Sequence, residues 1–113
     1  MIRRIPGSAP TRSRAVVYNG IVHAVAASPE KTPSVYDQTR LALAVIDRSL
    51  AEAGSDKSRI LTATVFLVDM SRKADMNRAW DEWVARDAAP MRACIGAALE
   101  GEDLVEIIVQ AAV

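Results

Sequence analysis

Arg92 is the residue whose type and position in the sequence most strongly suggest a functional site. It begins a short run of apolar and small residues, which indicates a β-strand. Alternation along this strand predicts Arg92, Cys94 and Gly96 on one face. A guanidinium on a buried strand needs a carboxylate, a phosphate or solvent as its partner. Arg92 therefore either binds the carboxylate of a ligand at a subunit boundary or forms a salt bridge with Glu106, Asp81 or a partner subunit.

Glu106 is the second candidate, because it interrupts the apolar run of residues 104–109 and is expected to be partly buried. A hairpin turning near Gly101 would place Glu106 opposite Gly96, on the face that carries Arg92. There its carboxylate could hold a water molecule or move a proton. The alternative is an ion pair with Arg92.

Cys94 and Asn77 complete the candidate residues. Cys94 is the single cysteine, and a lone strand cysteine is typical of packing, so we expect neither a disulfide nor covalent catalysis. Asn77 precedes Trp80 on a predicted helix and is either a site amide or a solvated side chain, whereas Trp80 and Trp83 are expected in the core. No phosphate loop, dinucleotide fingerprint or metal-ligand spacing occurs, so we expect no cofactor and no metal.

The composition limits the function further. The 113 residues contain 14 Lys+Arg and 14 Asp+Glu, which are interspersed. Binding to nucleic acid or to an anionic membrane depends on a concentrated basic face, so we expect neither partner. No run approaches the roughly 20 apolar residues that span a bilayer. We expect residues 1–113 to form a single domain of a soluble, cytoplasmic protein.

Hydrophobic periodicity predicts an α+β domain. Asn19-Gly20 predicts a hairpin, and the acidic segment 100–103 predicts a second one that closes the chain. Thr32 is the expected N-cap of the first helix, and Gly54 follows its end. Strands are predicted at residues 2–5, 15–18, 21–27, 60–68, 92–99 and 104–113, and helices at 35–53 and 76–84.

The strand at residues 60–68 is apolar on both alternating faces. Two helices can cover only one face of a mixed six-stranded sheet, so its other face must be buried in another way. We therefore expect an oligomer whose subunits pack sheet against sheet or close a shared barrel.

An ordered series of short motifs from about residue 15 to residue 113 resembles the RidA (YjgF) family, and most of all its YoaB-like branch. The resemblance implies a chorismate-mutase-like fold and a homotrimer with a central barrel and with sites between subunits. The motifs are Gln38-Thr39, Ile46-Asp47, Ala53-Gly54-Ser55, Thr64-Val65-Phe66-Leu67, Asp69-Met70, Met76-Asn77, Ala79-Trp80, Pro90, Arg92-Ala93-Cys94 and Val105-Glu106-Ile107.

The same resemblance implies an activity, the cofactor-independent hydrolysis of reactive 2-imino or 2-enamino acids to 2-keto acids and ammonia. Arg92 would bind the substrate carboxylate, and Glu106 would position or activate the attacking water. Cys94 and Asn77 would line the cleft.

Two departures separate this chain from the better-characterised deaminases of the family. Val25 and Ala26 stand where those enzymes have a Ser-Gly pair, and residues 12–14 offer no counterpart of an N-terminal tyrosine. A protein that binds or senses a keto acid without turnover is therefore an alternative. Other members are described as endoribonucleases or translation inhibitors, but balanced charge and sparse aromatic residues do not favour action on RNA.

Overall fold

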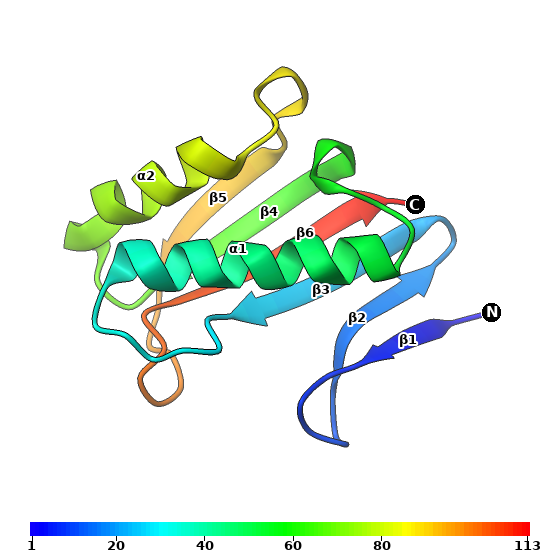
Figure 1. The fold of residues 1–113 in the computed structure, drawn as a ribbon, viewed down its shortest axis with the longest axis horizontal. Helices are drawn as coiled ribbons and strands as arrows, with labels where there is room; N and C mark the ends of the chain where they lie inside the picture. The colour runs from blue at the N-terminus through cyan, green and yellow to red at the C-terminus, as the bar shows by residue number, and fades with distance from the viewer.

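The computed structural model describes residues 1–113 as one six-stranded sheet with two helices on one face (Figure 1). The expected α+β class and the order of elements are confirmed, and the bounds agree within a few residues. The elements are β1 (Arg3–Pro6), β2 (Ser13–Tyr18), β3 (Ile21–Ala27), α1 (Val35–Glu52), β4 (Ile60–Leu67), α2 (Lys73–Trp83), β5 (Met91–Gly96) and β6 (Val105–Ala112).

The last strand, β6, lies inside the sheet, whose order is β1-β2-β3-β6-β4-β5. It pairs antiparallel with β3 along one edge and with β4 along the other, whereas β5 pairs in parallel with β4 at the sheet edge. The expected hairpin between the last two strands is therefore wrong. Val105, Ile107 and Val109 are fully buried, and a strand in this setting must satisfy its backbone groups along both edges.

Local signals gave the turns and helix ends, with one exception. Asn19 and Gly20 have φ angles of 53° and 76° and join β2 to β3, which confirms the expected hairpin. Gly54 has a φ of 83° just after α1, as expected for that position. Ser34, not Thr32, is the N-cap of α1, because its side chain accepts the N–H of Asp37. Thr32 instead accepts the N–H of Ser34.

The core lies between the helices and the sheet. Both helices cover the same face in Figure 1, with α1 over β3 and β6 and with α2 beside it toward the β5 edge. Neither is long and apolar enough to cross a membrane. The largest fully buried side chains include Leu43, Ile46 and Leu50 of α1, Met76 of α2, and Val65, Leu67, Val105, Ile107 and Val109 of the sheet.

The buried amide of Gln38 connects α1 to the loop that leads into β6. Its Nε2 donates to the carbonyls of Thr32 and Glu102, at 2.7 and 3.1 Å, and its Oε1 accepts the N–H of Leu104 at 2.9 Å. The side chain is fully buried. One residue thus satisfies three backbone groups that would otherwise lack partners.

We expect Gln38→Ala to lower the free energy of unfolding by about 2–4 kcal/mol, because it leaves three partly buried backbone groups without this partner and opens a cavity where the buried side chain lay. Urea unfolding followed by circular dichroism would measure the change. Arg48→Ala, an exposed change on the same helix, should stay within about 0.5 kcal/mol of wild type. Equal stabilities of the two variants would contradict this role of the amide.

Candidate functional site

Arg92 lies on β5 and points toward α2. In the parallel pairing of β5 with β4, Arg92, Cys94 and Gly96 lie beside Ala63, Val65 and Leu67. These three β4 residues face the helices, so Arg92, Cys94 and Gly96 lie on the helix side as well. The expected alternation is therefore confirmed.

Residues of α2 hold the Arg92 guanidinium. Its Nη2 donates to Asn77 Oδ1 at 2.8 Å, and its Nη1 lies 3.7 Å from Met76 Sδ. Its Cζ stands 5.2 Å from the centroid of the Trp80 ring. Trp80 is only 6% exposed, so core packing holds its ring in place beside the guanidinium.

No carboxylate neutralises Arg92 within the chain. The four ion pairs join Arg14 to Glu52, Lys31 to Asp103, Arg40 to Asp37 and Arg72 to Asp75. The predicted alternatives, a salt bridge with Glu106 or with Asp81, are therefore absent from the chain.

The guanidinium of Arg92 also keeps free donors. Arginine has five N–H groups, and only two contacts to protein are present, those to Asn77 and Met76. Every buried side-chain nitrogen has a hydrogen-bond partner, so the unpartnered Nε of half-buried Arg92 reaches solvent. A planar anion can therefore meet it without displacing a protein group.

Glu106 is on the other side of the sheet. It lies opposite Phe66 on β4 and Ala27 on β3, while its neighbours Val105 and Ile107 face the helices. The expectation that Glu106 shares the face of Arg92 is wrong, because that expectation required a β5–β6 hairpin and β4 lies between these strands. Glu106 is half-buried and has neither a hydrogen bond nor an ion pair from its carboxylate.

The other candidate residues divide between the same two faces. Cys94 is half-buried and packs against the core beside Arg92. Val25 of β3 is half-buried. It shares a face of the strand with Ala27, which is paired with Glu106, so Val25 lies on the face that carries Glu106. Ala26 is 4% exposed and points into the core.

The structure thus brings Arg92, Asn77 and Cys94 together and places Glu106 and Val25 on the opposite face. Sequence reasoning assigned Trp80 to core packing alone and missed its contact with Arg92. Helical spacing places Trp80 on the same face of α2 as Asn77, but it does not say which strand that face meets.

Comparison with known proteins gives the family. Residues 6–113 match the family model described as Endoribonuclease L-PSP. NMB1025 from Neisseria meningitidis, a member of the YjgF protein family, superposes with a TM-score of 0.93 and 40% identity, over 99% of this chain and 94% of that one. The chain belongs to the RidA (YjgF) family.

Curated relatives within the RidA family extend the match. A RutC family protein of Haemophilus ducreyi is 46% identical over 103 residues, which cover 89% of this chain and 88% of that protein. The RutC family protein YoaB of Escherichia coli strain K12 is 39% identical over 102 residues, which cover 89% and 90% of the two chains. The resemblance to the YoaB-like branch is therefore confirmed.

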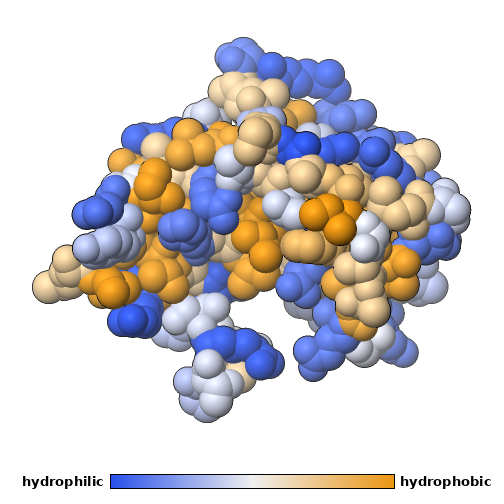
Figure 2. All heavy atoms as spheres, turned by 180° about the vertical axis from the view of Figure 1, so that it is seen from behind, coloured by the Kyte–Doolittle hydropathy of each residue, from blue (hydrophilic) through white to orange (hydrophobic).

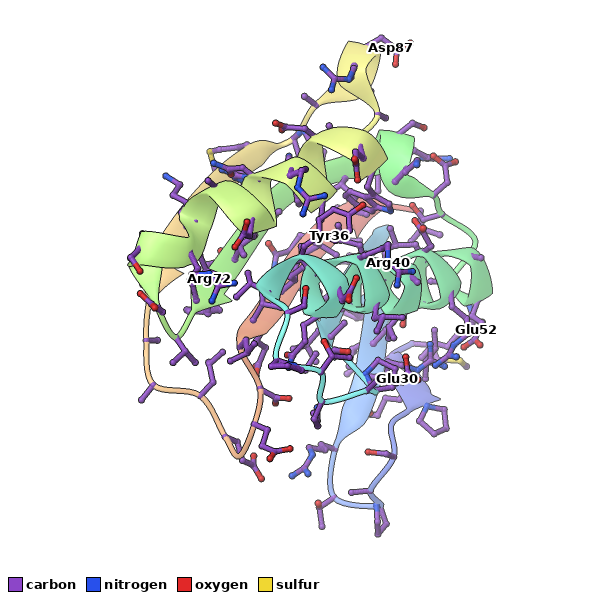
Figure 3. All side chains as sticks on the ribbon, turned by 60° about the vertical axis from the view of Figure 1, so that its left-hand side comes forward. Glu30, Tyr36, Arg40, Glu52, Arg72 and Asp87 are labelled. Atoms are coloured by element: carbon purple, nitrogen blue, oxygen red, sulfur yellow. The ribbon has the colours of Figure 1, made fainter.

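In this RidA-family chain, the short 3-10 turn Met70–Arg72 leads directly into α2. Figure 3 shows Arg72 at the start of α2. Asp69 caps the turn, because its carboxylate accepts two hydrogen bonds from Ser71. The Ser71 hydroxyl donates at 2.7 Å and the Ser71 backbone N–H donates at 3.0 Å. The Ser71 hydroxyl, followed by the Ser71 N–H, lowers the pKa of Asp69 below its usual value.

Folding lowers the pKa of Asp69, so the ionised Asp69 carboxylate stabilises the folded chain. This stabilisation is fully present above the pKa that Asp69 has in the unfolded chain, and it is lost as pH falls through the lower pKa of Asp69 in the folded chain. We expect Ser71→Ala to raise the Asp69 pKa toward its usual value. Carboxyl-carbon NMR titration would measure this. Asp56, whose pKa is lowered in the same way by Ser58, is the internal control and should not move. An unchanged Asp69 pKa would contradict the assignment.

Proposed function

We propose that the protein hydrolyses 2-imino or 2-enamino acids to 2-keto acids and ammonia at a carboxylate-binding site between subunits. The observation that carries the proposal is Arg92, a half-buried guanidinium that is held by neutral side chains and has free donors. Such a group suits the bidentate binding of a small carboxylate. Membership of the RidA family, whose name refers to imine deamination, supports the same activity.

The uncovered face of the sheet supports self-association. Figure 2 shows this face, on which hydrophobic side chains lie over the strands between polar ones. Val68 and Ile95 are each 46% exposed and Met91 is 72% exposed. Apolar area of this kind favours burial against another subunit. A homotrimer whose uncovered faces form a central barrel is the assembly we propose, and a stable monomer in solution would contradict it.

The division of the candidate residues between two faces favours a site shared by subunits. Arg92 lies at the β5 edge on the helix side, and Glu106 lies two strands away on the uncovered side. One small ligand cannot touch both within a single chain, because the sheet separates them. A second copy that packs beside β5 would bring its own Glu106 to the ligand held by Arg92.

The proposed reaction needs only these groups and water. Arg92 binds the carboxylate and orients the adjacent C=N bond. Glu106 accepts a proton from water as the water oxygen bonds to the imine carbon, and it passes this proton to the imine nitrogen, which gives a tetrahedral aminoalcohol. Glu106 then moves the hydroxyl proton to the amino nitrogen as the C–N bond breaks, so that ammonia leaves and the hydroxyl oxygen becomes the keto oxygen. The unpartnered carboxylate of Glu106 suits this proton transfer.

One observation favours a second candidate, a keto-acid binding protein without turnover. Val25, on the face that carries Glu106, has no hydroxyl or amide with which to hold a water molecule or an amino group. Binding of 2-oxobutanoate without acceleration of imine hydrolysis would select this candidate.

We expect Arg92→Lys to lower kcat/KM for 2-iminopropanoate roughly 10- to 100-fold, because lysine cannot reproduce the planar fork and a hydrogen bond to a charged group is worth about 1.5–3 kcal/mol. The imine would be generated enzymatically from an amino acid, and keto-acid formation would be measured. Arg48→Lys, an exposed change on α1, is the control and should match wild type. A wild-type protein that does not exceed the buffer rate would reject the deaminase.

A further inference from the structure

We propose that Asn77 is a positioning residue, which fixes the Arg92 guanidinium by a hydrogen bond while leaving its charge unneutralised for a ligand carboxylate. The inference rests on the proposed carboxylate-binding function and goes beyond it, since it assigns Asn77 to the arginine and not to the ligand. It also assigns the fixed ring of Trp80 a part in the same support.

One helix, α2, supplies three supports of the guanidinium. Asn77 Oδ1 accepts from Nη2 at 2.8 Å, the Trp80 ring centroid lies 5.2 Å from Cζ, and Met76 Sδ lies 3.7 Å from Nη1. All three come from α2, and Met76 and Trp80 are buried. The arginine side chain therefore loses conformational freedom before any ligand arrives, which lowers the entropic cost of binding.

All three supports are electrically neutral. A carboxylate at the position of the Asn77 amide would form a charge-assisted pair with Arg92 and would compete with the carboxylate of a ligand. The three acids of α2 are placed elsewhere. Asp75 pairs with Arg72 at 2.9 Å, Glu82 accepts the hydroxyl of Tyr36, and Asp81 forms no ion pair. The Asn77 amide thus orients Arg92 without neutralising its charge.

The substitution Asn77→Asp tests this directly, because it changes the amide to a carboxylate of nearly the same shape. We expect the Kd for 2-oxobutanoate, measured by titration calorimetry on the intact assembled protein, to rise roughly tenfold or more. The melting temperature should stay equal to that of wild type or increase, because the variant gains an ion pair with Arg92. A purely structural role of Asn77 predicts instead that melting temperature and affinity fall together.

A pH series supplies a second readout. Arg92 should lower the pKa of the introduced carboxyl group, and protonation below that pKa makes the group neutral again. The ratio of variant Kd to wild-type Kd should therefore fall toward one as pH decreases. The ligand stays charged as 2-oxobutanoate, because 2-oxobutanoic acid is a stronger acid than an aspartic side chain. Asn77→Ala, which removes the acceptor without adding charge, should raise Kd only a few-fold and show no such pH dependence.

The matched control is Arg78→Gln, which also lowers the net charge by one unit on α2. Arg78 is exposed and stacks on the Tyr36 ring, with its Cζ 3.7 Å from the ring centroid, away from Arg92. The Kd of Arg78→Gln for 2-oxobutanoate should equal that of wild type. If this Kd rises as much as in Asn77→Asp, the effect comes from overall charge and the inference is wrong.

The remaining outcomes separate the two proposals. If wild type binds 2-oxobutanoate, Arg92→Ala does not, and Asn77→Asp binds as tightly as wild type, the carboxylate site stands and the role of Asn77 is overturned. If wild type does not bind the keto acid, both the proposed function and this inference fail.

Discussion

β6 forms backbone hydrogen bonds along both of its edges, with β3 on one side and β4 on the other, and the remaining architecture depends on that placement. It makes β6 the central buried strand and leaves β5 at the edge of the sheet. Because side chains alternate along a strand, it also fixes Glu106 on the face opposite to the helices. Gln38 reinforces the arrangement by bonding the loop that delivers the chain into β6.

The second constraint is electrostatic. Within the chain, the charge on Arg92 is balanced by no carboxylate, and the carboxylate of Glu106 has no cation or hydrogen-bond donor beside it. Two half-buried charges of opposite sign thus have no ion-pair partner within the single chain. A small zwitterionic ligand bound between subunits would give each of them one, so the proposed site uses the charges that the single chain leaves without a counter-ion.

Sequence reasoning succeeded where the determining interactions are local. Asn19-Gly20 specified its hairpin through backbone conformation alone, and strand alternation placed Arg92 and Cys94 on the correct face. Glu106 was misplaced because its face relative to Arg92 depends on which strands pair, and the chain passes β4 after β5, so that β6 lies between β4 and β3. The contact between Trp80 and Arg92 required the packing of α2 against β5, which periodicity within either element does not specify.

The central claim is that one site takes Arg92 from one subunit and Glu106 from another, and mixed assemblies test it most directly. Arg92→Ala and Glu106→Gln subunits, each inactive alone, would be co-refolded in equal amounts and assayed for imine hydrolysis. If the site is shared, random mixing in a cyclic oligomer restores roughly a quarter of the sites, because some adjacent pairs contribute both intact groups. Mixtures that remain as inactive as the parent variants, although mass spectrometry shows mixed oligomers, would contradict the account.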